Sequence, residues 1–275
     1  MTYGPAAVDP VDERRKAGAR LRMETRGGKS RLADLAEWGG YRLKFPAAID
    51  RPEAVLINTG GGMAGGDELE LKIELGAGAA LTFTTSSAER VYRTLGPLTQ
   101  VAVDLDVGAA ADLAFIPQET ILFSRARLTR AITAEVADDG RLLLAETLVF
   151  GRAASGERIT AGALRDRWRV RRGGRLIYAD DVLLEGAMSG ALQRPAIGAG
   201  AGATGCVLYV APDAADRLEE ARMLINSAAC RVAVSTWNGL LCIRALGEPA
   251  AVRRILATVI TGLLRRPLPR VWLGF

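Results

Sequence analysis

The sequence contains no histidine, three cysteines and few aromatic residues, which make up 5% of its 275 residues. Histidine is the commonest metal ligand in proteins and the usual general acid or base near neutral pH. Its absence excludes Ser-His-Asp triads, Cys-His dyads and histidine-rich zinc sites. Any metal ion that this chain handles must therefore use carboxylate, thiolate, carbonyl or water ligands.

The cysteines, Cys206, Cys230 and Cys242, are too far apart in the sequence for a CxxC zinc knuckle. Their odd number argues against a disulfide framework, so we expect buried free thiols in a reducing compartment. Residues 1–31 contain no apolar run typical of a signal peptide, and the long uncharged stretch 196–211 is interrupted by glycines. These features predict a cytoplasmic protein without a membrane span.

The 36 Lys and Arg residues outnumber the 31 Asp and Glu residues, for a formal net charge of +5. The basic residues are spread along the chain, except for a cluster near the N-terminus in which acidic residues are interspersed. With so few aromatic side chains to stack on bases, this pattern predicts no nucleic-acid binding. We expect residues 1–30 to form a loose basic arm that docks on a partner, followed by a single domain over residues 31–275.

Apolar and charged residues alternate without a break over 68–75, which is typical of a half-buried strand. Similar short segments follow one another along the chain, several of them separated by glycine-containing turns. They cover residues 80–85, 99–107, 113–116, 130–136, 142–150, 168–172 and 176–184. This pattern predicts a mainly β fold, either an all-β sandwich or solenoid-like stacked sheets.

Two α-helices are predicted near the C-terminus. The first covers 213–228, with Asp213 as its N-cap, and the second follows an apolar stripe over 252–264 that ends before Pro267. Between them, the Asn-Gly pair at 238–239 predicts a β-hairpin.

A glycine-rich run over 60–66 follows an apolar segment and fits the letters of a dinucleotide-binding motif. That motif needs a helix directly after its last glycine, because the helix N-terminus holds the pyrophosphate. Here Asp67 and the alternating segment 68–75 follow instead. We therefore interpret the run as a close connection between strands. An enzyme that uses this loop and Asp67 on a nucleotide or a sugar is the alternative.

Several segments, taken in order, resemble the urease accessory protein UreD (UreH) family. They cover residues 58–67, 81–93, 115–123, 146–152, 156–157 and 267–272. The resemblance implies a mostly β fold with helices towards the C-terminus and no enzymatic activity. It also implies binding to apo-urease and to UreF, contact with the GTPase UreG through UreF, and nickel delivery to urease through an internal channel. A plain binding scaffold without a metal role is a further alternative.

The absence of histidine argues against a tight Ni²⁺ site, since Ni²⁺ prefers imidazole or thiolate ligands. Carboxylates bind more weakly and release the ion, as transit requires. We therefore expect no tightly bound cofactor, and Ni²⁺ only in transit. Six carboxylates in or next to the resembling segments are candidates for this route; the alternative for each is an ordinary surface or ion-paired group. They are Asp67, Glu68, Glu89, Glu119, Glu146 and Glu157.

Overall fold

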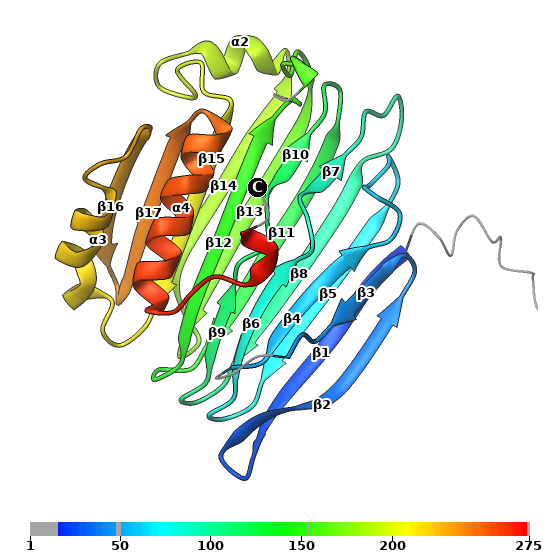
Figure 1. Ribbon diagram of the computed structural model, residues 1–275. Helices are drawn as coiled ribbons and strands as arrows, with labels where there is room; N and C mark the ends of the chain where they lie inside the picture. The colour runs from blue at the N-terminus through cyan, green and yellow to red at the C-terminus, as the bar shows by residue number, and fades with distance from the viewer. Residues whose placement is uncertain (1–15, 48–50, 153–154, 274–275) are drawn as a thin grey trace, which may run out of the picture.

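The chain folds into two stacked β-sheets, with helices on the outer side of one of them (Figure 1). The structure is a computed structural model and describes residues 16–47, 51–152 and 155–273. In spatial order, the seven-stranded sheet consists of β14 (Arg175–Gly186), β13 (Gly162–Arg172), β11 (Arg127–Val136), β8 (Thr99–Val107), β5 (Glu68–Leu75), β1 (Lys16–Arg26) and β2 (Lys29–Trp38). The ten-stranded sheet consists of β16 (Arg231–Trp237), β17 (Leu240–Gly247), β15 (Ala203–Val210), β12 (Arg141–Phe150), β9 (Asp112–Phe115), β6 (Ala80–Thr85), β4 (Glu53–Asn58) and β3 (Tyr41–Lys44), with β10 (Thr120–Leu122) between β12 and β7 (Glu89–Val91).

The central part of the chain passes back and forth between the two sheets. Strands β5, β8, β11 and β13 run parallel to one another in one sheet, and β4, β6, β9 and β12 do so in the other. Parallel neighbours need a crossover connection, and here the crossovers run through strands of the opposite sheet. The prediction of a mainly β, solenoid-like stack of sheets is confirmed.

The main core lies between the sheets and explains the period of two in the sequence. In β5 the apolar residues of the alternating segment are buried, and the charged residues between them point away from the core. From the opposite sheet, the rings of Phe83 and Phe115 stack at 5.0 Å between centroids. Because alternate side chains point to opposite faces of a strand, the alternation fixes which face of each strand joins this core.

The predicted helices are present near the C-terminus, and a second core lies beneath them. Helices α3 (Leu218–Ile225) and α4 (Pro249–Leu264) lie on the outer side of the ten-stranded sheet (Figure 1). A Cβ at Gly205 in β15 would lie 2.8 Å from the side chain of Leu256, so glycine permits the close approach of α4. The predicted hairpin is formed by β16 and β17. Shorter helices are α2 (Met188–Gln193), η2 (Ala215–Arg217) and η3 (Arg270–Trp272).

The first helix begins later than predicted, at Leu218 after the η2 turn. Asp213 does not cap it, because its carboxylate accepts hydrogen bonds from Arg141 at 2.7 Å and from the Tyr209 hydroxyl at 3.0 Å. By contrast, α4 ends at Leu264 before the proline, as predicted. Within the described residues, no helix has both the length and the apolar character needed to cross a bilayer.

The expectation of a loose arm over 1–30 is wrong for residues 16–30. Residues 16–26 form β1, which pairs with β2 on one side and with β5 on the other. Its alternate residues Ala17, Ala19, Leu21 and Met23 are buried in the core. The small residues Ala17, Gly18 and Ala19 at its start, followed by Arg20 and Arg22, make the alternation less visible in the sequence. Residues 1–15 of the expected arm lie outside the described residues.

Candidate functional site

The glycine-rich loop connects β4 to β5 and packs closely against β7 and the residue that follows it. The Met63 amide donates to the Arg90 carbonyl at 2.7 Å, and the Tyr92 amide donates to the Met63 carbonyl at 2.8 Å. Gly62 has a φ of 155°, and a Cβ there would lie 2.6 Å from the Tyr92 ring. The loop is therefore a close connection between strands, as predicted.

Asp67 and Glu68, at the end of this loop, lie in different surroundings. The Asp67 carboxylate accepts the Ala64 amide proton at 2.7 Å, and the Asp67 amide donates to the Ala64 carbonyl at 3.1 Å. Glu68 begins β5 and is exposed. The structure thus gives Asp67 a role in closing the glycine loop, and it leaves Glu68 on the outer face of the sheet.

Replacing Asp67 by alanine is expected to lower the free energy of unfolding by about 1 kcal/mol, because the Ala64 amide loses its acceptor. Glu68→Ala is the matched control and should leave stability unchanged, since its side chain is exposed. Urea denaturation of both variants measures the difference. Equal stability of the two variants would show that the Asp67 contact does not hold the loop.

Glu119 and Glu157 are both engaged in ion pairs. Glu119 pairs with Arg253 of α4. Glu157 pairs with Arg152 at 2.9 Å, and this arginine also lies over the ring of Phe123 at 4.6 Å. Hydrogen bonding from Arg152 lowers the pKa of Glu157. These two carboxylates link neighbouring segments of the chain and do not line the central cavity described below.

Glu89 in β7 is a partly buried carboxylate held by polar neighbours. It accepts hydrogen bonds from the Tyr41 hydroxyl at 3.0 Å and from Asn58 Nδ2 at 2.8 Å. Burial raises the pKa of Glu89, although these hydrogen bonds oppose the effect. Tyr41, Asn58 and Glu89 line a small polar cavity of about 40 Å³, which also includes the exposed Arg90.

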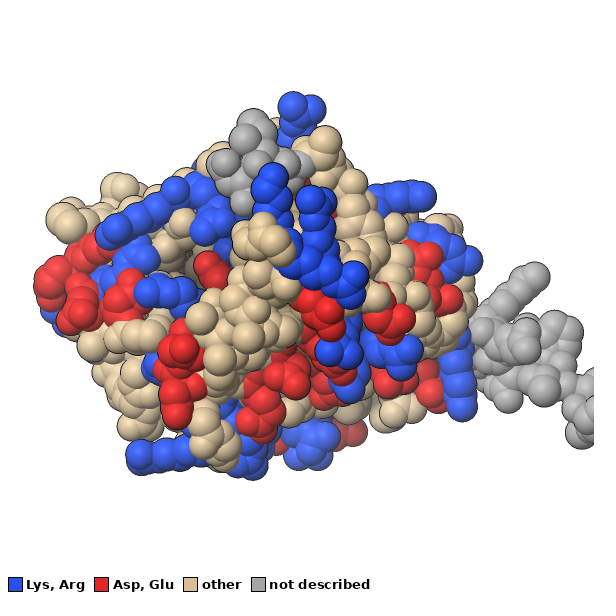
Figure 2. Space-filling model, turned by 90° about the horizontal axis from the view of Figure 1, so that it is seen from below, with Lys and Arg blue, Asp and Glu red and all other residues tan. Residues whose placement is uncertain are grey.

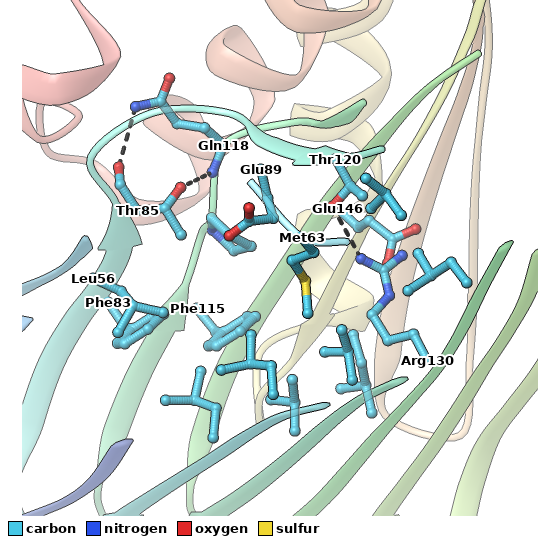
Figure 3. A pocket seen from close by; sticks show the side chains of 18 of the residues that line it. Leu56, Met63, Phe83, Thr85, Glu89, Phe115, Gln118, Thr120, Arg130 and Glu146 are labelled. Atoms are coloured by element: carbon cyan, nitrogen blue, oxygen red, sulfur yellow. Dashed lines mark hydrogen bonds and ion pairs between the residues drawn. The ribbon is translucent and has the colours of Figure 1, made fainter. Parts of the chain in front are cut away.

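A larger cavity of about 80 Å³ lies between the two sheets (Figure 3). Most of its wall is apolar, and Figure 3 shows Met63 in it together with the rings of Phe83 and Phe115. Glu89 and Glu146 are the two carboxylates among its lining residues. Since a water molecule occupies a cavity of roughly 10–15 Å³ on this measure, the space is large enough for a partly hydrated ion.

Glu146 in β12 belongs to a buried charged cluster with Arg130 of β11 and Asp166 of β13. Arg130 binds Asp166 through two hydrogen bonds, of 3.0 Å from Nε and 2.8 Å from Nη2, and its Nη2 also pairs with Glu146. Burial raises the pKa of Glu146 well above its usual value, although the charge of Arg130 opposes this shift. Burial also disfavours ionisation of Asp166, but Arg130 outweighs it and lowers the pKa of that carboxyl.

Glu146 also lines a third cavity, of about 50 Å³, together with Asp166, Asp180, Cys206 and Arg244. Glu89 thus lines the first and second cavities, and Glu146 lines the second and third. Among the residues described by the structure, no group of three or more Cys, Asp or Glu is arranged to hold a metal ion. The arrangement is a series of single carboxylates rather than a chelating cage.

Comparison with known proteins decides the family. The model of the UreD urease accessory protein family matches residues 15–273. The chain belongs to the UreD family. It is 48% identical to urease accessory protein UreD 1 of Methylobacterium radiotolerans, over 98% of this chain and 99% of that protein. It is 43% identical to urease accessory protein UreD of Xanthobacter autotrophicus, over 94% of this chain and 90% of that protein. Membership supports a role in urease maturation, and the resemblance found in the sequence is confirmed.

Two of the three cysteines of this UreD-family chain lie close together. Cys206 in β15 and Cys242 in β17 belong to the inter-sheet core, whereas Cys230 precedes β16 and packs with the second core. All three are free thiols, as predicted, but only Cys242 is buried; the expectation of burial is wrong for Cys206 and Cys230, which are partly exposed. A hydrogen bond from Cys206 lowers the pKa of Cys242 to about 7, against the effect of burial. The same hydrogen bond, together with burial, raises the pKa of Cys206 well above its usual value. The sequence did not indicate that Cys206 and Cys242 are neighbours, because the register of β15 against β17 brings them together.

The surface shown in Figure 2 carries both signs of charge, with Lys and Arg side chains interspersed among Asp and Glu. Exposed ion pairs mix the two signs in the same way, for example Arg20 with Asp34 at 3.1 Å and Arg165 with Asp181 at 3.1 Å. Such pairs add little to stability. On the face that Figure 2 shows, acidic side chains break up the positive charge, so it carries no continuous basic stripe of the kind that binds nucleic acid.

Proposed function

We propose that this UreD-family chain acts in urease maturation by passing Ni²⁺ through the space between its sheets. Glu89 and Glu146 carry the proposal, because each lines two of three successive cavities. In this proposal apo-urease binds the chain at one end of the row of cavities. UreF binds at the other end, and the GTPase UreG contacts the chain through UreF. The chain has no turnover of its own and works in the cytoplasm, where its thiols stay reduced.

The chemistry of the cavities suits a cation that must be released. A carboxylate oxygen holds Ni²⁺ less tightly than imidazole or thiolate does. The apolar wall of the central cavity, with residues such as Leu71 and Val103, offers the ion no competing ligand. An ion inside would therefore interact mainly with Glu89, with Glu146 and with its own water molecules.

The buried cluster allows Glu146 to turn towards a passing ion. Arg130 keeps both of its hydrogen bonds to Asp166 when Glu146 moves away, so its charge is not left unpaired. An unpaired charge in this position would cost several kcal/mol (about 3–5). Asp166 thus serves the route by holding Arg130 in place.

The geometry weighs against the nucleotide-enzyme alternative. A phosphate-binding loop needs backbone amides that point at the ligand. Here the Gly61, Met63 and Gly66 amides donate to the carbonyls of other residues in the chain. These hydrogen bonds leave the loop with few donors for a phosphate group.

The test compares Glu89→Gln with Glu68→Gln in a reconstituted activation assay that contains apo-urease, the partner proteins and Ni²⁺. Both changes remove one negative charge, but Glu68 is exposed on the outer face of β5. Glu89→Gln is expected to lower urease activation about tenfold, the size of effect typical near metal ligands. Both variants should copurify with urease and UreF as the unmodified chain does. Full activation by Glu89→Gln would support the plain-scaffold alternative instead.

A further inference from the structure

Beside Glu146, the third cavity contains polar residues to which the nickel route gives no role. Strand register places Glu146 of β12 opposite Cys206 of β15, and Cys206 opposite Arg244 of β17. Tyr178 and Asp180 face this row from β14 of the other sheet. Arg244 donates to the Tyr178 hydroxyl at 2.8 Å and pairs with Asp180 at 2.6 Å.

Cys242 stands beside this row on the same inward side of β17. It pairs with Leu208, two residues beyond Cys206, so the two cysteines are diagonal neighbours on adjacent strands. Cys242 is 4% exposed, and Cys206 is partly exposed and lines the cavity. The Tyr178 hydroxyl lies 3.9 Å from Cys206 Sγ.

Sheet geometry favours a bridging ion over a disulfide at this position. Diagonal neighbours on paired strands lie roughly 7–8 Å apart. A disulfide joins Cα atoms that are usually less than about 7 Å apart, so it would require movement of the strands. Two metal–sulfur bonds of about 2.3 Å each span a wider gap between the sulfurs than the single S–S bond of a disulfide, which is about 2 Å long.

The ligand set points to one class of ion. Zinc normally takes four protein ligands in a structural site, whereas the described part of the chain places no third Cys, Asp or Glu with this pair in a metal-binding group. Soft thiolate ligands select Cu(I), which accepts two of them. Arg244 lies opposite Cys206 in the strand register, so its positive charge can compensate the negative charge of two metal-bound sulfurs.

We propose that Cys206 and Cys242 form a two-thiolate site for a soft monovalent cation of the Cu(I) type. Binding replaces the remaining thiol protons by the metal and releases them to solvent, without any change of oxidation state. The site does not depend on the proposed nickel route, because neither urease nor Ni²⁺ takes part in it.

The test titrates the full-length chain anaerobically with Cu(I), kept reduced by ascorbate, in competition with the chelator bathocuproine disulfonate. The unmodified chain and Cys230→Ser are each expected to withdraw one equivalent of Cu(I) from the chelator. Cys206→Ser and Cys242→Ser should withdraw none. Cys230→Ser is the matched control because it removes a thiol that belongs to the other core.

Circular dichroism establishes that each variant folds. If the buried Cys242→Ser variant does not fold, Cys206→Ser decides, because Cys206 is only partly buried. One retained equivalent in Cys206→Ser would overturn the proposal, as would loss of binding in Cys230→Ser or no binding by the unmodified chain. Tighter binding of Zn²⁺ than of Cu(I) by the same two thiols would overturn the assigned class of ion.

Discussion

A chain that carries both Glu89→Gln and Glu146→Gln is expected to assemble with its partners and yet to yield about 100-fold less active urease, since loss of groups around a metal typically costs 10–100-fold. The two changes remove both carboxylates that line the central cavity. Arg130 then stays paired with Asp166 alone, so its charge remains balanced. A divalent cation would meet an apolar wall that offers it no carboxylate.

The matched control is the double variant Glu68→Gln and Glu70→Gln, which changes net charge equally on the exposed side of β5. Activity, nickel content of the urease and copurification of the partners are measured for both double variants. Thermal unfolding shows whether the inner variant keeps its fold. Activation by a folded inner variant at the level of the outer one would contradict a route through the central cavity. Loss of partner binding in the inner variant would make these carboxylates structural.

Much of the fold could be predicted from the sequence in segments where apolar and polar residues repeat regularly. The strands over 68–75, 80–85 and 99–107 have the predicted bounds, because large apolar residues alternate there with polar ones. β1 was missed, since Ala17 and Ala19 are small and the basic residues around them suggested a solvated arm. β15 was missed too, because Gly205 interrupts its apolar pattern and the strand packs on both faces.

The candidate site could be predicted only in part, because strand register and sheet spacing are long-range properties. The sequence identified Glu89 and Glu146 as carboxylates of interest but gave no reason to separate them from Glu119 or Glu157. Arg130 could not be predicted as their neighbour, since the sequence does not distinguish a buried, ion-paired arginine from an exposed one. The one indication of its burial was its place in β11, where it falls in phase with the buried apolar residues Leu128 and Ile132.

The C-terminal segment after α4 is expected to stabilise the fold strongly through Trp272. This side chain is 7% exposed, and its Nε1 donates to Thr84 Oγ1 at 3.1 Å and to the Ile116 carbonyl at 3.2 Å. Arg253 of α4 lies over its ring at 4.9 Å. Trp272 therefore links α4 to the ends of β6 and β9, on the outer side of the ten-stranded sheet.

Trp272→Ala is expected to lower the free energy of unfolding by about 3–5 kcal/mol, the usual cost of removing a buried tryptophan. Trp272→Phe keeps much of the packing and should cost about 1–3 kcal/mol, because Thr84 and the Ile116 carbonyl lose their shared donor. Leu273→Ala is the matched control, since Leu273 is the next residue in the sequence and is 70% exposed. Urea denaturation followed by circular dichroism measures all three. If Trp272→Ala were no less stable than Leu273→Ala, the segment would be a dispensable tail, and the contacts with Thr84 and Arg253 would contribute nothing to holding α4 on the sheet.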